Sequence, residues 1–174
     1  MNDDLKELMV FDPAGNALLV LCKVFACLGG LVMVGITCLS IVSIVGRKLA
    51  ATPIQGDVEI LQMVAAPAIA CFFAYCHMIG GDVKVDFIAE RFSRRTQNVL
   101  DCIGSLLLAL VAALLAWRTG AGAMALYESG ETSALLAWPI WISQALLVPG
   151  FSLQALVGIY MSSRHLTNDA RRGA

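Results

Sequence analysis

Few side chains in this sequence could do chemistry, and they lie at the margins of long apolar runs. Glu59 and His77 flank one such run, and ionisable groups in membrane helices are typical of proton relays. Cys71 and Cys76 lie within the same run and could form a redox pair. Simpler roles compete. The dipole of a helix stabilises a glutamate at its amino terminus, so Glu59 is either a cap or a group that pairs with a partner helix. A hydrogen-bonding anchor is the favoured interpretation of His77.

Several enzyme classes are excluded by counting residues. A b-type haem bundle needs paired histidines on facing helices, and the chain has only His77 and His165. The sequence contains no H-E-x-x-H motif, no G-x-S-x-G motif and no phosphate-binding loop. A small proton-coupled exporter needs an acidic residue in the middle of a span, and the apolar runs contain none. We therefore expect no catalytic residue, no metal site and no bound cofactor.

The cysteines form no C-x-x-C pair, and each lies within or at the edge of an apolar run. They are Cys22, Cys27, Cys38, Cys71, Cys76 and Cys102. Buried cysteines most often serve as small apolar packing residues. A four-helix membrane redox protein that uses cysteines or a quinone remains the alternative, and the spacing of Cys71 and Cys76 is its best support.

The elements that carry these residues are four stretches with almost no charged side chains. About 20 apolar residues let a helix cross the roughly 30 Å hydrocarbon core, and in lipid the backbone must satisfy its own hydrogen bonds. We therefore predict an all-α membrane protein of one domain, residues 1–174. Its four transmembrane helices lie at about 17–46, 58–80, 99–118 and 139–162. Hydrophobic residues make up 59% of the chain, which suggests a lipid environment. The net charge of −1 gives no indication of a nucleic-acid partner.

A short amphipathic connector is predicted between the second and third helices. Val85, Ile88, Ala89 and Phe92 recur at helical spacing beside several arginines, a pattern typical of a helix on the membrane surface. A solvated connector without such a helix is the alternative.

The distribution of lysine and arginine predicts that both termini are cytoplasmic. With that orientation Trp117, Trp138 and Trp141 fall at the outer interface, where aromatic rings are enriched. Arg118 then extends from the end of the third helix towards the outer head groups.

Proline and glycine predict how the helices bend and pack. Pro149 and Gly150 are expected to bend or locally unwind the fourth helix. Small residues permit close approach of membrane helices. The glycines expected to serve lateral packing are Gly29, Gly30, Gly35 and Gly104.

Three motifs in helix order resemble a known transporter family. They are Arg47 followed by Gly56-Asp57-Val58-Glu59, then Ala74-Tyr75-Cys76-His77 followed by Val85-Asp86-Phe87-Ile88, then Thr132, Pro139-Ile140-Trp141 and Pro149-Gly150-Phe151-Ser152-Leu153. Together they are similar to the small membrane subunit (DctQ-like small permease) of tripartite ATP-independent periplasmic, or TRAP, transporters. One departure is the longer spacing between His77 and Asp86, which leaves the connector conformation open.

The resemblance implies a scaffold role and defined partners. A large TRAP membrane subunit of about a dozen helices would hold the substrate and sodium sites. A periplasmic substrate-binding protein would deliver an organic anion, often a carboxylate. The chain would then be a multi-pass protein of the bacterial cytoplasmic (inner) membrane and not an enzyme. The subunit-contact candidates are Arg47, Glu59, His77 and Asp86.

Overall fold

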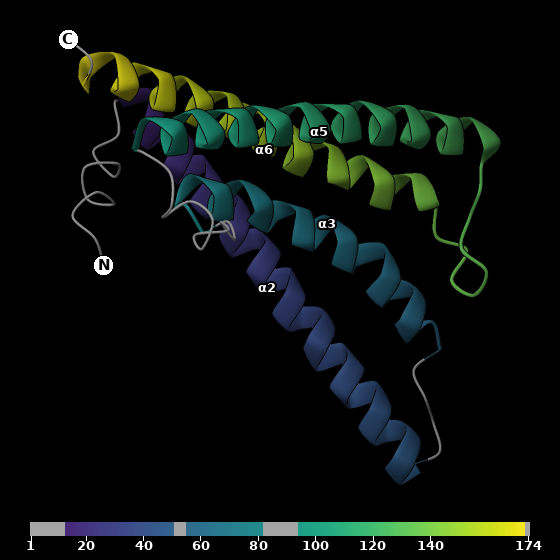
Figure 1. Cartoon of the computed structure of the whole chain (residues 1–174). Helices are drawn as coiled ribbons and strands as arrows, with labels where there is room; N and C mark the ends of the chain where they lie inside the picture. Colours follow the sequence, from purple (N-terminus) through teal and green to yellow (C-terminus); the bar gives the residue numbers. More distant parts are fainter. Residues whose placement is uncertain (1–12, 51–54, 82–93, 173–174) are drawn as a thin grey trace.

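The chain folds into four long helices, seen in a computed structural model that describes residues 13–50, 55–81 and 94–172. In chain order they are α2 (Pro13–Ala50), α3 (Asp57–Met78), α5 (Arg94–Ser129) and α6 (Ile140–Arg172) (Figure 1). Each contains a stretch long and apolar enough to span a membrane. The prediction of an all-α protein with four helices long and apolar enough to span a membrane is confirmed for the described residues. Residues 82–93, which hold most of the expected connector, lie outside the described part.

Proline and glycine residues explain where several of the helices begin and end. Pro13 is the first residue of α2, a position where its missing N–H is not needed. At the end of α3, Gly80 has a φ of 67°, and the Gly81 N–H donates to the Cys76 carbonyl at 2.9 Å. The Gly80 N–H donates to the His77 carbonyl, which completes a Schellman cap. Gly130, with a φ of 66°, follows the last residue of α5.

The third helix is longer than its sequence suggested. The apolar run weakens at Trp117, yet α5 continues through Arg118 to Ser129. Residues 119–129, expected in a connection between helices, are therefore helical. At about 1.5 Å per residue, the 36 residues of α5 measure about 54 Å, against about 33 Å for the 22 residues of α3.

The helices form an open row in the order α2, α3, α6, α5. Neighbours in this row make the main contacts, while α2 and α5 lie at its two edges. Figure 1 shows the α2–α3 pair diverging from the α5–α6 pair towards the end where α2 ends and α3 begins. We call this the loop end of the row. A closed four-helix bundle would instead pair α2 with α5 around a shared core.

Burial along α2 shows why it is an edge helix. Its buried residues recur at every seventh position, and all but one of them are small: Gly15, Cys22, Gly29, Ile36 and Ser43. This spacing places them in one narrow stripe along the helix. The remaining circumference of α2 is exposed or half-buried, so the helix contacts its neighbours on one side.

One glycine lies in a tight contact within each neighbouring helix pair. A Cβ atom at Gly29 would lie 2.7 Å from the Ala68 carbonyl oxygen of α3. A Cβ at Gly150 would lie 3.0 Å from the Ala70 carbonyl oxygen, between α6 and α3. A Cβ at Gly158 would lie 2.8 Å from the Ala109 Cβ, between α6 and α5. Backbone atoms cannot yield as a flexible side chain can, so these three positions set the helix spacing.

The four glycines singled out for packing differ in their surroundings. Gly29 lies in a tight contact, and a Cβ at Gly30 would meet the Phe72 ring at 3.9 Å. Among the described residues, no atom of a neighbouring element lies within 4 Å of a Cβ at Gly35 or Gly104. Composition alone could not separate these cases, because the helix face decides which glycine meets a neighbour.

We expect Gly29→Leu to separate α2 from α3. Overpacking against backbone destabilises by about 1–3 kcal/mol, and this clash includes a carbonyl oxygen. The measurement is the thermal denaturation midpoint of the purified chain in mild detergent. Gly35→Leu, on the same helix in open space, is the matched control and should leave the midpoint unchanged. Equal midpoints for the two variants would contradict the packing described here.

A proline inside α3 explains one contact between α3 and α6. Pro67 has no N–H, so the carbonyl of Met63, four residues earlier, lacks its helical donor. The hydroxyl of Ser143 in α6 donates to that carbonyl. Unsatisfied backbone groups are strongly disfavoured in lipid, so this bond links the two helices at a defined level. The second proline, Pro149, lies inside α6, which runs through it without a break.

Candidate functional site: the loop end of the row

Glu59 attaches the connection between α5 and α6 to the first turn of α3. Its carboxylate accepts hydrogen bonds from the Ser133 hydroxyl at 2.7 Å, the Leu135 N–H at 2.8 Å and the Leu136 N–H at 3.0 Å. We call these four residues the Glu59 latch. Hydrogen bonds to a charged acceptor are stronger than those between neutral groups. The latch therefore holds two segments together that are distant in the sequence.

The latched connection is also closed by its own backbone. The Ser133 N–H donates to the Trp138 carbonyl at 2.8 Å, and Thr132 and Pro139 form an antiparallel bridge. Ala137 has a φ of 53°, which is uncommon for a residue with a side chain. Surrounding contacts must hold such a conformation. The latch and the bridge supply those contacts.

Leu136 packs over Gly56, the residue directly before the first residue of α3. Gly56 has a φ of 82°, and a Cβ at this position would lie 2.7 Å from the Cγ atom of Leu136. Glycine is therefore required twice, once for the backbone conformation and once for the space. The sequence Gly56-Asp57-Val58-Glu59 thus provides a turn, a place for Leu136 and the carboxylate of the latch.

Asp57 connects α3 to the end of α2. One carboxylate oxygen accepts from the buried Ser43 hydroxyl and lies 3.9 Å from an Arg47 nitrogen. The other accepts from the Val58 N–H at 2.9 Å. The Asp57 side chain is 15% exposed, whereas the Arg47 side chain is 61% exposed. An exposed ion pair contributes little to stability, so the Ser43 bond is the firmer link.

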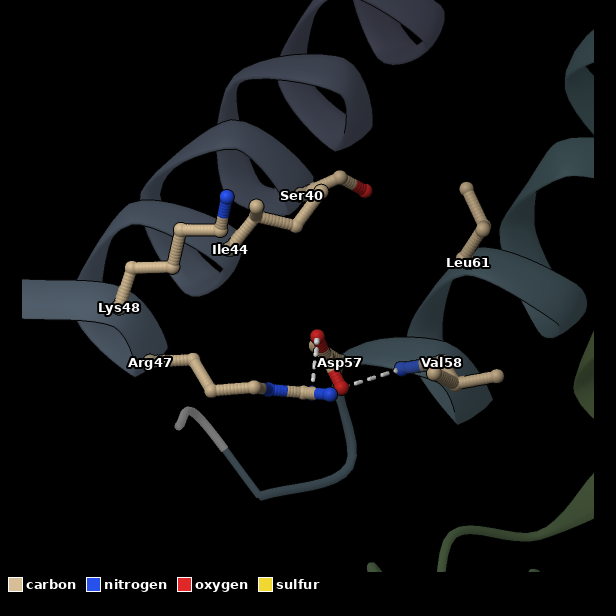
Figure 2. Close-up of a pocket in the computed structure, with 7 residues that line it drawn as sticks. All are labelled: Ser40, Ile44, Arg47, Lys48, Asp57, Val58 and Leu61. Carbon is tan, nitrogen blue, oxygen red and sulfur yellow. Dashed lines mark hydrogen bonds and ion pairs between the residues drawn. The ribbon is translucent and has the colours of Figure 1, made fainter. Parts of the chain in front are cut away.

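An open pocket of about 340 Å³ lies beside this link, between α2 and α3. Figure 2 shows Arg47 and Lys48 on the α2 side, with Val58 and Leu61 opposite them on α3. Its lining residues are Ser40, Ile44, Arg47, Lys48, Asp57, Val58 and Leu61. The lining is mostly apolar, with its charges near the helix ends.

The predicted contact candidates have different surroundings. Arg47 is exposed at the loop end, and the Glu59 carboxylate is engaged by groups of its own chain. His77 lies at the opposite end of α3 and is buried, with 5% of its surface exposed. Asp86 lies outside the described residues. Glu59 and Arg47 therefore occupy one end of the row, and His77 the other.

The expected aromatic anchors do not share one level along the helices. Tyr127 packs edge-to-face on Trp141 with ring centroids 5.5 Å apart, so Tyr127 and not Trp117 is level with the start of α6. Trp117 is 70% exposed and lies ten residues before Tyr127 in α5. Trp138 is half exposed in the connection itself. The difference arises because α5 extends to Ser129, beyond the residue expected to end it.

No cysteine in the described residues forms a disulfide. Cys22 is buried, Cys27 and Cys38 are exposed, and Cys71, Cys76 and Cys102 are half-buried. The Cys102 thiol lies 3.2 Å from the Ser162 hydroxyl, between α5 and α6. Within the described ranges, no group of three or more His, Cys, Asp or Glu side chains is placed to hold a metal ion.

Sequence reasoning missed the serines that connect the helices. Ser43, Ser133 and Ser143 each donate a hydrogen bond across an element boundary. Two signals could have found Ser43 and Ser143. Small residues recur every seven positions in α2, ending at Ser43, and a proline inside a membrane helix requires a substitute donor such as Ser143.

Comparison with known proteins agrees with the family that the motifs indicate. The family model described as "Tripartite ATP-independent periplasmic transporters, DctQ component" matches residues 33–168. Searches among curated proteins and among solved structures found no match. The family match covers most of the chain, from α2 to the end region of α6. The chain therefore belongs to the DctQ family and is the small membrane component of a TRAP transporter.

Proposed function

We propose that this chain is the scaffold subunit of a sodium-driven importer of an organic anion, and that it packs laterally against the large transport subunit. A periplasmic binding protein supplies the anion, and the chain itself is not an enzyme. It resides in the bacterial inner membrane, with both termini in the cytoplasm. Family membership supports the tripartite assembly. The substrate class, the sodium coupling and the mode of packing are parts of the proposal.

The observation that carries the scaffold role is the open row. Only 11% of the most apolar window of α2 is buried within the chain, and 17% of that of α5, against 33% for α6. A self-sufficient transporter would enclose a substrate site between its helices. A row with two uncovered edges instead offers long apolar faces to lipid and to another membrane protein.

Polar groups at the helix ends support the same role. Arg47 is exposed at the loop end, so it is available to a neighbouring subunit. Asp86, which lies outside the described residues, remains a proposed contact. Glu59 is hydrogen-bonded within its own chain, and His77 is buried. These two residues would affect the subunit interface indirectly, by fixing the conformation of the helix ends.

The test is affinity recovery of the tagged chain from its native membranes in mild detergent, followed by mass spectrometry. We expect a large polytopic protein in about equal amount. Asp86→Ala should lower the amount of this partner more than it lowers the stability of the chain. Recovery of the chain alone would contradict the proposal, and recovery with a quinone would also support the redox alternative.

A further inference from the structure

Arg118 carries a positive charge on the outward face of α5, far from both ends of that helix. Its side chain is exposed, as are those of Leu114 and Leu115 one turn before it. The helix continues for eleven residues beyond it to Ser129, which is about 16 Å at 1.5 Å per residue. Among the described residues, no carboxylate lies within ion-pair distance of Arg118.

The level of Arg118 in the membrane follows from α3. The 22 residues of α3 measure about 33 Å, close to the hydrocarbon thickness of about 30 Å, so its ends mark the two boundaries. The Glu59 latch holds the connection after Ser129 at the first turn of α3. The end of α5 therefore lies at the boundary, and Arg118 lies about 16 Å below it, or about 12 Å if α5 tilts by 40°.

Contacts between the helices give the same level independently. Gly120, two residues after Arg118, lies against Val148 of α6. Gly150, two residues after Val148, lies against Ala70, which is near the middle of α3. Arg118 is thus level with the middle of the span.

An arginine at this depth needs a negative partner. Long cationic side chains reach the head groups from near helix ends, but arginines in the middle of a span face protein or a water-filled cavity and pair there. The expectation from the sequence that Arg118 reaches the head groups depends on the third helix ending near residue 118. Since α5 continues to Ser129, the outward face of α5 at Arg118 requires a protein neighbour.

We infer that this face of α5 is an interface with the large subunit, and that a carboxylate on a transmembrane helix of that subunit pairs with Arg118. The inference rests on the proposed function, because it takes the large subunit as the neighbour. The planar guanidinium can bind a carboxylate through two parallel hydrogen bonds. Leu114 and Leu115 flank the pair and would exclude lipid and water from it.

The test compares Arg118→Leu with wild type in the affinity-purified complex. Breaking a buried ion pair leaves the partner's carboxylate uncompensated, so we expect recovery of the large subunit to fall roughly tenfold or more. The isolated Arg118→Leu chain should keep its thermal denaturation midpoint, because leucine is favoured on an apolar helix face. Lys23→Leu is the matched control. This substitution removes an exposed cation from α2, the other edge helix. Lys23 follows Cys22, which is buried with Ala74 and Met78 near the carboxyl end of α3. Its loss should leave the recovery of the large subunit unchanged.

A second variant identifies the partner group. Arg118→Lys keeps the charge, and we expect it to retain most of the large subunit. An apolar carbodiimide should then join the new amine to a carboxylate of the large subunit, which peptide mapping would locate. Equal recovery for wild type and Arg118→Leu, or a lowered midpoint for the isolated Arg118→Leu chain, would overturn the inference. Absence of any polytopic partner with the wild-type chain would instead overturn the proposed function from which the inference starts.

Discussion

Gly158→Leu is expected to detach α5 from α6. A Cβ at this position would lie 2.8 Å from the Ala109 Cβ and 2.9 Å from the Ser105 carbonyl oxygen. Both atoms belong to the backbone or are fixed to it, so they cannot move without moving α5. Overpacking of this kind destabilises by about 1–3 kcal/mol, and the larger leucine side chain should reach the upper part of that range.

The α5–α6 contact offers a direct readout of this change. The Cys102 thiol lies 3.2 Å from the Ser162 hydroxyl, so Ser162→Cys should form a disulfide with Cys102 under mild oxidation. We expect Gly158→Leu to reduce the yield of that disulfide several-fold, as measured by peptide mapping. Gly104→Leu, on α5 in open space, is the control and should leave the yield unchanged. An undiminished yield in Gly158→Leu would refute the tight approach at this residue.

Glu59→Gln should release the connection between α5 and α6. The carboxylate accepts from the Ser133 hydroxyl and from the N–H groups of Leu135 and Leu136. A glutamine has one acceptor oxygen in place of two, and its amide N–H₂ would face donors. Because Ala137 holds an uncommon φ of 53°, the connection should relax once the latch is lost.

Amide hydrogen exchange measures this opening. We expect the Leu135 and Leu136 amides to exchange roughly tenfold faster or more in Glu59→Gln, because they lose a charge-assisted bond. Glu128→Gln, an exposed carboxylate at the end of α5, is the control and should leave these rates unchanged. The expectation from the sequence, that Glu59 acts at a subunit boundary, predicts the opposite pattern: unchanged exchange and reduced recovery of the large subunit.

Much of the architecture could be predicted from residue patterns. Apolar runs free of charge predict spanning helices, because lipid accepts no unsatisfied backbone and few charges. Gly80 and Gly81 predict the end of α3, and the structure shows the cap that they form. The ordered motifs at Arg47, Glu59 and Pro149 were sufficient to indicate the transporter family, which the family match confirms.

The end of α5 could not be predicted in the same way. Past Trp117 the sequence contains Gly120 and Gly122, which lower the helix propensity, and Arg118, which lowers the hydrophobicity. In the structure, the two glycines allow α5 to continue against Val148 and Gln144 of α6. Packing against a neighbour therefore outweighed local propensity, and this extension changes the expected depth of Arg118.

The sequence by itself determined that the chain has four helices apolar enough to cross a membrane and which family it belongs to, because hydrophobicity and motif order are properties of the linear chain. Only the tertiary structure decided that the helices form an open row, that Glu59 binds Ser133 and two backbone amides, and that Gly150 and Gly158 set the helix spacing. These features depend on which helix faces meet. That choice is made by contacts between residues distant in the sequence, such as Met63 and Ser143, which are 80 positions apart.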